Sequence, residues 1–531
     1  MDSGSQADLA RMLRLWQPPS LHDLPLLVDF LPHSSPRANS PAAALPTPGP
    51  VGQMPPGATS PPMLTHLPSA HRILPAMVVL ATAGLASTAH ATEVVWDGHY
   101  RMRGEFFDSL SLSDTAANAN AEGAAWHMDH RLRLRPGFRI TDQVAVFTQV
   151  DALPYVQWGS QPVYAIDPAT GEALPVVYSE AVGPPTTEDG GVTPQNIQVT
   201  RLWGEVKTKV GLLRFGRVPN HWGSGMVFNA GNRAMDEYGD TVDRVQFAGQ
   251  VGQVFLMGGI ENRYEGLAAE KDDYRAIVTS VLFESEKAAL GTFHTYRWRG
   301  STDTRYGVWI GDIWGRADLG ILKAETEFAA IVGGGDLQNG VNDIRTSAFG
   351  GHIRLGLDPG TFRAGVLTGF ATGDADPNDT SIKTFSFDPD FSIGLFLFEE
   401  TMPTLTPPAN TLDDDGRTTA AARTGPTVSD ALFFQPRVGW RFNDDLTADL
   451  TYLAARRAKK LELEELEGKA PGYGQEIDAT VRWDATSHFW VQATGAVFLP
   501  GPVFAEYEDA DFGTGFDQPA FGGRILTTIE F

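Results

Sequence analysis

The final segment of the chain reads as one amphipathic strand that ends on an aromatic residue. Because successive side chains of a strand point to opposite faces, Ile525, Ile529 and Phe531 share one face, and Arg524 and Glu530 share the other. A strand of about 10 residues with an aromatic end is typical of transmembrane β-barrels, whose aromatic side chains lie at the membrane interface. This segment therefore predicts a membrane barrel.

A second constraint is an apolar run that follows two basic residues. His71 and Arg72 precede residues 73–86, and the tripeptide Ala89-His90-Ala91 has small residues at the spacing of a signal-peptide cleavage site. The run is shorter than the roughly 20 apolar residues that a spanning helix needs. We expect a secretory signal peptide over residues 71–91, with cleavage after Ala91.

The residues before this run are rich in Pro, Ser and Ala and show no sustained hydrophobic period. Such a composition buries too little apolar surface to order itself. We interpret residues 1–70 as disordered, or as a start site assigned too early, with Met63 as the natural start. The predicted organisation is a disordered segment over 1–70, the signal peptide over 71–91 and an outer-membrane barrel over 92–531.

Composition excludes several classes of protein. No run of 18 apolar residues follows residue 91, so helical membrane spans are not expected. The chain has no cysteine, which fits an exported protein that does without disulfides. Its 41 basic and 65 acidic residues give a formal net charge of −24, which argues against a nucleic-acid partner.

Charge alternation indicates which face of each strand points inward. Arg131, Arg133 and Arg135 alternate with Leu132 and Leu134. In a soluble protein three aligned arginines would form a solvated face, but in a barrel they must face the lumen, because an arginine at the lipid midplane costs about 2–4 kcal/mol. The same alternation recurs near residues 101 and 201. The predicted channel-lining residues are Arg101, Arg103, Glu105, Arg131, Arg133, Arg135, Arg201 and Glu205.

Similar alternating segments recur along the rest of the chain. We expect further strands at residues 144–150, 212–217, 253–260, 275–283, 290–298, 306–314, 322–332, 350–357, 362–370, 391–398, 433–442, 446–454, 475–483 and 488–498. The predicted fold class is therefore all-β, an antiparallel transmembrane barrel of about 16–18 strands. Long polar segments, 159–196, 373–389, 401–430 and 456–474, are predicted external loops, with a short helix at 459–468.

One segment carries a resemblance to a known family. Residues 365–379 (GVLTGFATGDADPND), followed by 383–389 (KTFSFDP), resemble the strand and loop signature of alginate-export-type outer-membrane porins. Residues 476–480 and 497–502 are similar to the closing hairpin of that family, and residues 213–217 resemble one of its strands. The resemblance is strongest in the last third of the chain. It implies a pore lined by arginines that passes an anionic polysaccharide.

A weak calcium signal lies inside the same segment. Asp374, Asp376, Asn378 and Asp379 place side-chain oxygens at near-alternate positions around Pro377. Oxygen ligands at such spacing suit calcium, but the distal bidentate glutamate of an EF-hand loop is missing. A solvated acidic turn is the other interpretation, and no further cofactor is expected.

Histidines give no stronger sign of chemistry. We expect His127 and His130, which lie close to Asp129, to be hydrogen-bonding residues near the rim and not metal ligands. His221 and Ser224 lie three apart in a glycine-rich turn, without the G-x-S-x-G pattern of a nucleophile elbow. An outer-membrane hydrolase is therefore a minor alternative, and no enzyme is predicted.

The sequence thus predicts a porin-like channel of the bacterial outer membrane, surrounded by lipid, for passive passage of a polar, anionic solute or polysaccharide. Two interpretations of the inward arginines stay open. They attract anions into the lumen, or they pair with carboxylates such as Glu105 and Glu205 and hold the wall together. A structural or adhesive barrel without an open pore is the alternative function.

Overall fold

The computed structural model describes most of the chain after residue 92. The described residues are 93–110, 112, 124–153, 156–163, 177–180, 197–264, 274–300, 305–336, 343–375, 379–400, 402–403, 411–412, 418–419, 423–424, 427–459, 471–505, 508–509, 513–514 and 516–531. The predicted signal peptide, the segment before it and the predicted loop helix at 459–468 lie outside this part, apart from residue 459. No helix among the described residues is long and apolar enough to cross a membrane.

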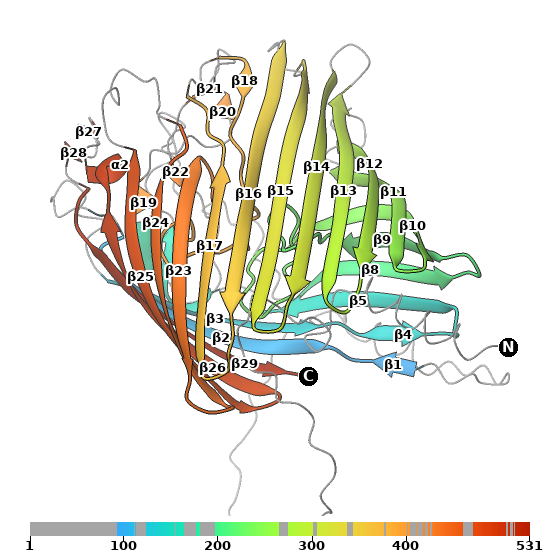
Figure 1. The fold of residues 1–531 in the computed structure, drawn as a ribbon, viewed down its shortest axis with the longest axis horizontal. Coiled ribbons are helices and arrows are strands. Elements are labelled where there is room, and N and C mark those ends of the chain that lie inside the picture. The colour runs from blue at the N-terminus through green and yellow to red at the C-terminus, as the bar shows by residue number, and fades with distance from the viewer. Residues whose placement is uncertain are drawn as a thin grey trace, which may run out of the picture. The chain divides into compact units, whose positions relative to one another are not determined.

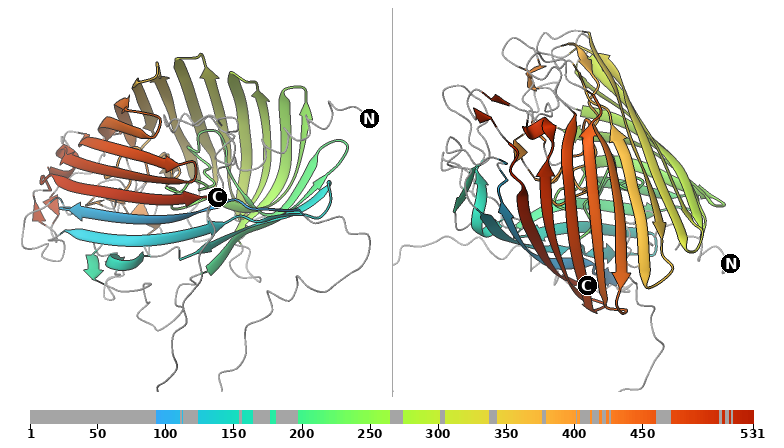
Figure 2. Two further views of the ribbon diagram at one scale, coloured as in Figure 1. Left: turned by 90° about the horizontal axis from the view of Figure 1, so that it is seen from below. Right: turned by 60° about the vertical axis from the view of Figure 1, so that its left-hand side comes forward.

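Within the described residues, 18 antiparallel strands form a closed barrel (Figures 1 and 2). These strands are β2 (Gly98–Asp108), β3 (Ala125–Leu134), β5 (Val144–Ala152), β8 (Ile197–Lys207), β9 (Leu212–Pro219), β10 (Thr241–Val251), β11 (Val254–Tyr264), β12 (Tyr274–Glu284), β13 (Ala288–Gly300), β14 (Arg305–Asp318), β15 (Leu322–Gly335), β16 (Ile344–Leu357), β17 (Phe362–Ala371), β23 (Ala431–Arg441), β24 (Leu446–Arg457), β25 (Gly472–Thr486), β26 (Phe489–Pro500) and β29 (Ala520–Glu530). Each pairs with the next, so the predicted fold class is confirmed.

The ring closes where the last strand meets the first. β29 pairs with β2 over ten residue pairs, from His99 opposite Glu530 to Asp108 opposite Phe521. Shorter elements accompany the ring. They are β1 (Glu93–Val95), β4 (Gly137–Arg139), β6 (Val156–Val163), β7 (Val177–Glu180), β18 (Ser381–Ile382), β19 (Met402–Pro403), β20 (Thr411–Leu412), β21 (Thr418–Thr419), β22 (Arg423–Thr424), α2 (Pro502–Ala505), β27 (Glu508–Asp509) and β28 (Gly513–Thr514).

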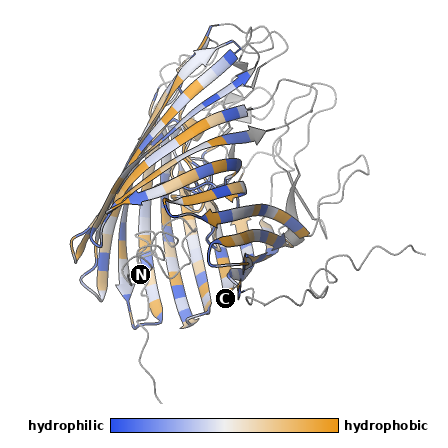
Figure 3. Ribbon diagram, turned by 90° about the vertical axis from the view of Figure 1, so that its right-hand side faces the viewer, coloured by the Kyte–Doolittle hydropathy of each residue, from blue (hydrophilic) through white to orange (hydrophobic). Residues whose placement is uncertain are grey.

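Apolar side chains cover the outer face of the strands. Ile260, Ile313 and Ile525 are 62%, 56% and 57% exposed, while inward neighbours such as Leu526 and Thr528 are buried. Hydrophobic and hydrophilic residues alternate along the strands in Figure 3. Because a soluble protein rarely exposes so continuous an apolar surface, this face fits a lipid environment.

The two ends of the barrel differ in the length of their connections. At one end short turns join the strands, and Gly252 and Gly320 adopt positive φ angles of 62° and 87° there. Glycine allows this backbone conformation without a steric penalty. At the other end lie longer connections, such as 220–240 and 372–430. Barrels of the outer membrane keep short turns on the periplasmic side, so the longer connections mark the external side.

Parts of the chain itself occupy the interior. A large cluster of buried apolar side chains includes Phe385, Phe396 and Leu397, which belong to the connection after β17, together with wall residues such as Phe433 and Phe498. A smaller cluster joins Trp222 and Phe228 to inward side chains of β10–β14. Both clusters lie on the inner side of the barrel wall.

Most predicted strands are confirmed within a few residues of their ends. One strand was missed: no strand was predicted between residues 217 and 253, whereas β10 occupies Thr241–Val251. The strand predicted at residues 391–398 is wrong: these residues form no strand and pack inside the barrel. Their alternating apolar side chains contact the interior of the protein instead of lipid.

Candidate functional site

Two connections fold inward and contact the inner wall. We call residues 220–240, between β9 and β10, the first inner segment. Near one of its ends, Trp222 donates a hydrogen bond to Asp312 of β14 at 3.1 Å. Near its other end, the carbonyl oxygen of Ala234 accepts hydrogen bonds from Arg101 of β2 and Arg131 of β3, at 3.1 and 3.0 Å. Because β2 and β14 lie on distant parts of the ring, this segment crosses the lumen.

Most of the predicted channel-lining arginines hold this segment or the wall. Arg131 donates a further hydrogen bond, at 2.5 Å, to the carbonyl oxygen of Asp236. Arg133 forms a bidentate pair with Asp151 at 2.7 and 2.8 Å. Arg135 pairs with Asp97 at 2.8 Å. These guanidinium groups are buried and engaged, which favours the interpretation that they knit the wall together.

The other predicted residues are also paired. Arg201 donates to Gln149 and Asn232 at 2.9 and 2.8 Å. Glu205 accepts hydrogen bonds from Arg214 and from the indole of Trp203. Arg133 and Arg201 do border a cavity of about 380 Å³ beside Tyr238 and Gly239.

An ionic cluster joins the first inner segment to β2 and β3. Arg101 and Arg103 both contact Asp129 at 2.6 Å, and both contact Glu237. Burial opposes the charge of Glu237, but the two guanidinium groups dominate and lower its pKa to about 2. Glu237 is therefore a permanent anion that binds the segment to this wall.

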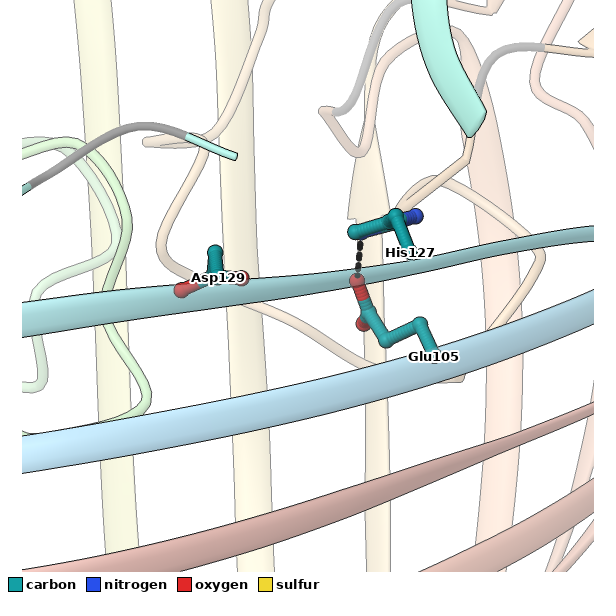
Figure 4. A group of neighbouring side chains, drawn as sticks. All are labelled: Glu105, His127 and Asp129. Carbon is teal, nitrogen blue, oxygen red and sulfur yellow. Dashed lines mark ion pairs between the residues drawn. The ribbon is translucent and has the colours of Figure 1, made fainter. Parts of the chain in front are cut away.

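Glu105, His127 and Asp129 offer ligand atoms within 4.8 Å of one another (Figure 4). His127 and Glu105 point toward each other, with Nε2 and Oε2 2.7 Å apart. Both carboxylates already bind cations, since Glu105 contacts Arg524 and Asp129 contacts two arginines. Guanidinium groups thus supply the positive charge that a metal ion would bring. His130 instead contacts the hydroxyl of Tyr100 at 2.7 Å.

The second inner segment, residues 383–400, lies along other strands. The carboxylate of Glu476, on β25, accepts hydrogen bonds from the amides of Leu395, Phe396 and Leu397 at 2.5, 2.9 and 2.8 Å. Arg524 of β29 contacts Glu399 at 3.4 Å. Burial raises the pKa of Glu399, and the positive charge of Arg524 offsets part of that rise.

Two aspartates of the second inner segment bind the first. Asp388 accepts a hydrogen bond from the amide of Asn229 at 3.1 Å. Asp390 accepts from the amides of Glu237 and Tyr238 at 2.7 and 3.1 Å. Burial is the largest cause that raises the pKa of Asp388 to about 7 and that of Asp390 to about 6. This contact therefore titrates near neutral pH.

A cavity of about 280 Å³ lies between these segments and the wall. Both inner segments and strands β16, β17, β23, β24, β25, β26 and β29 line it. Five arginines contribute, namely Arg233, Arg354, Arg437, Arg482 and Arg524. Carboxylates of the inner segments face the same space, namely Asp236, Glu237, Asp390 and Glu399. The cavity thus carries both signs of charge.

Three of the wall arginines occupy successive rows of the strand register. On β25 the residues Asp478, Thr480 and Arg482 follow one another on the inner face, about 7 Å apart. Arg437 lies in the same row as Asp478, because Thr451 of β24 is directly opposite both residues. Arg524 lies in the same row as Thr480, because Thr494 of β26 is directly opposite both residues. We call Arg437, Arg524 and Arg482 the arginine series.

Each member of the arginine series keeps a carboxylate partner. Arg437 contacts Asp449 at 2.8 Å, and Arg482 contacts Asp484 at 2.8 Å. Arg524 contacts Glu105 and, at 3.4 Å, Glu399. Sequence reasoning missed this series because the three residues lie on three different strands. Their common neighbourhood follows from strand register, which a single sequence does not specify.

The calcium candidates are only partly described. Asp376 and Asn378 lie outside the described residues. Asp374 and Asp379 both contact the ammonium group of Lys383, at 3.5 and 3.1 Å. In the described part of the loop, a lysine therefore bridges the two carboxylates.

The hydrolase candidate has an unexpected partner. Ser224 Oγ lies 2.7 Å from Nε2 of His352 and donates to Glu327 at 2.6 Å. His221 instead accepts from the amide of Ala230 at 3.4 Å. A serine nucleophile needs a histidine oriented by a third group, but Nδ1 of His352 is buried and has no hydrogen-bond partner among the described residues. This cluster therefore anchors the first inner segment to β15 and β16.

Comparisons with known proteins give no family. No known family matches the sequence, and no curated protein matches it either. Among solved structures, OpdK of Pseudomonas aeruginosa with vanillate is 10% identical, with a TM-score of 0.44, over 82% of this chain and 98% of that one. OccK2 (OpdF) of the same species is 11% identical, with a TM-score of 0.46, over 83% and 98%. OccAB2 of Acinetobacter baumannii is 11% identical, with a TM-score of 0.44, over 82% and 98%.

The closed ring, the apolar outer face and the unequal ends identify the environment of the chain. An even number of antiparallel strands with short turns at one end is the architecture of bacterial outer-membrane barrels. Only a closed barrel or a helix satisfies every backbone polar group within lipid. The chain is a β-barrel of the bacterial outer-membrane type, with two segments of its own folded into the lumen.

Proposed function

We propose that this barrel is a passive channel for small polar solutes that carry an anionic group. The observation that carries the proposal is the arginine series beside the 280 Å³ cavity. Guanidinium groups bind carboxylates and phosphates through paired hydrogen bonds. Three of them in the lining of one cavity offer an anion neighbouring positions.

The carboxylate partners make such binding weak, which transport requires. Asp449 is shared between Arg437 and the buried Arg363, and Asp484 pairs with Arg482. A passing anion exchanges with these partners and moves on, since conduction needs binding that is favourable on entry and weak enough for release. The movement follows the gradient of the solute, and no bond is made or broken.

The inner segments favour a small solute over a polysaccharide. They cross the lumen and leave a space of about 280 Å³. Carboxylates on them, such as Glu237 and Asp390, repel a solute with several negative charges. We infer a single anionic group next to a polar or cationic one.

The kinship with alginate-export-type porins is a separate part of the proposal. It rests on residues 365–379, and the described part of that stretch has a structural role. The carbonyl oxygen of Thr372 accepts from the amide of Phe385 at 2.8 Å, and Asp374 accepts from the amide of Lys383 at 3.1 Å. The motif thus fixes the beginning of the second inner segment.

Ion selectivity tests the channel. The folded full-length protein is inserted into planar bilayers, and the reversal potential is measured under a KCl gradient. We expect anion preference, and a lower anion-to-cation permeability ratio in the double variant Arg437→Gln/Arg482→Gln. The control is Arg316→Gln, an inward arginine paired with Glu284 that does not line the cavity. An unchanged ratio in the double variant contradicts the role of the arginines.

The same measurement distinguishes a channel from the alternative, a structural or adhesive barrel without an open pore. The two inner segments fill much of the lumen, which is the observation that favours this alternative. A barrel plugged by these segments shows no steady current. Steady single-channel steps support the channel.

A further inference from the structure

The outer face carries a row of residues that the transport proposal does not use. Neighbouring strands β12 to β16 (Figure 1) place five residues directly opposite one another. Arg275 is opposite Trp298, which is opposite Gly307, and Gly307 is opposite Gly334, which is opposite Arg345. Strands lie about 4.8 Å apart, so the row spans about 19 Å.

The two residues in the middle of this row are glycines. Gly307 and Gly334 have no side chains, whereas Trp298 and Arg345 stand on either side. A Cβ atom at Gly307 would lie 2.7 Å from the hydroxyl oxygen of Tyr296, so this hydroxyl reaches over the glycine. We call Arg275, Trp298, Arg305 and Arg345 with the two glycines the rim recess.

The rim recess lies at the external edge of the apolar band. Arg275, Arg305 and Arg345 are exposed and stand near the ends of their strands that carry the longer connections. The next outward row toward the periplasm contains Tyr296 directly opposite Trp309. Aromatic side chains mark the interface between hydrocarbon and headgroups, so the three arginines lie at the level of the headgroups.

Arg305 has aromatic neighbours, and among the described residues no carboxylate pairs with Arg305 or Arg345. The guanidinium of Arg305 lies 5.6 Å from the ring centre of Trp298 and 5.9 Å from that of Tyr296. Among the described residues, neither Arg305 nor Arg345 forms an ion pair. Such cations at a membrane surface attract anionic headgroups.

We propose that the rim recess binds the phosphorylated sugar headgroup of an outer-leaflet glycolipid. The hydroxyl of Tyr296 over Gly307 offers a hydrogen bond to the headgroup, Trp298 and Tyr296 offer surfaces for sugar rings, and the arginines bind phosphate oxygens. The acyl chains then lie along the apolar face below. The site lies on the outside of the wall and is independent of what passes through the lumen.

Lipid binding to the folded full-length protein in neutral detergent tests this site. The probes are diphosphorylated lipid A and the same lipid without its phosphates, and bound lipid is measured by native mass spectrometry. We expect the wild type to retain the phosphorylated form. The variant Arg275→Gln/Arg305→Gln/Arg345→Gln should bind it about 100-fold more weakly, from roughly a factor of five for each arginine at an anionic membrane surface.

Two controls make the result decisive. Arg456→Gln removes an exposed arginine from β24, on another part of the ring, and should leave binding unchanged. The corresponding triple lysine variant keeps the charge and should recover most of the affinity. Equal binding of the two lipids by the wild type overturns the proposal without any variant, and so does full binding by the triple glutamine variant.

Discussion

Asp390, in the second inner segment, accepts a hydrogen bond at 2.7 Å from the backbone amide of Glu237, in the first. The contact joins two connections that are anchored to different parts of the wall. Burial, followed by the charge of Asp236, raises the pKa of Asp390 from 3.8 to about 6. The space between the segments and the wall is therefore coupled to pH.

We expect conductance to rise with pH. Because the pKa of Asp390 is raised in the closed contact, the closed contact holds its proton more tightly than an opened one. The contribution of this contact to the stability of the closed arrangement is fully present below about pH 4. It declines by roughly 1–3 kcal/mol as the pH rises through about 6. Asp388, with a pKa of about 7, extends the decline. Single-channel recordings between about pH 4 and 8 measure the change in conductance.

The variant Asp388→Asn/Asp390→Asn is the control for this titration. Its amide side chains keep a carbonyl acceptor but do not ionise in this range. We expect a nearly constant conductance. A wild-type profile in this variant would assign the pH dependence to other groups.

Glu476 should determine whether the second inner segment stays in place. Glu476→Ala leaves the amides of Leu395, Phe396 and Leu397 without their acceptor. Hydrogen bonds to a charged group contribute about 1.5–3 kcal/mol each, so the segment should detach and conductance should increase. Glu476→Gln keeps one acceptor oxygen, so its conductance should lie between those of the wild type and of Glu476→Ala. Equal conductance in all three proteins would mean that other contacts hold the segment.

Ser224→Ala should change stability and not chemistry. The substitution removes hydrogen bonds to Glu327 and His352 inside the barrel, which should lower the free energy of unfolding by about 1–3 kcal/mol. Denaturant unfolding in detergent measures the loss. Hydrolysis of a short-chain ester should be absent from both proteins. Hydrolysis that depends on Ser224 would restore the hydrolase alternative.

Ile525, the middle residue of β29, should report the lipid-facing side. Ile525→Arg places a charge on the outer face where the side chain is 57% exposed, at a cost of about 2–4 kcal/mol near the bilayer midplane. Ile525→Leu should cost little. Folding into vesicles, followed by denaturant titration, compares the two. Equal folding would place this residue away from lipid.

The sequence allowed the barrel to be predicted because a strand in a membrane wall repeats a local rule. The alternation at residues 131–135 and at the C-terminus needs no knowledge of distant contacts. The inner segments obey no such rule. Residues 391–398 alternate like a strand, and only their contacts with residues such as Glu476 reveal that they lie inside.

The candidate site was harder to predict than the wall for the same reason. The grouped arginines 131, 133 and 135 were conspicuous, yet Arg133 and Arg135 are held by single wall carboxylates. Arg437 and Arg482 lie on different strands and meet only through the pairing of β23, β24 and β25. Register over such distances follows from the whole barrel and cannot be taken from one segment.

The closing seam has a consequence for assembly. Arg524 and Glu105 meet across this seam although 419 positions separate them in the chain. Arg524 also contacts Glu399, and Arg101 beside the seam contacts Glu237, so both inner segments are bound to the strands that close the ring. A ring that is complete leaves only its narrow ends for entry. The last step of folding therefore encloses a chain that has already filled its own interior.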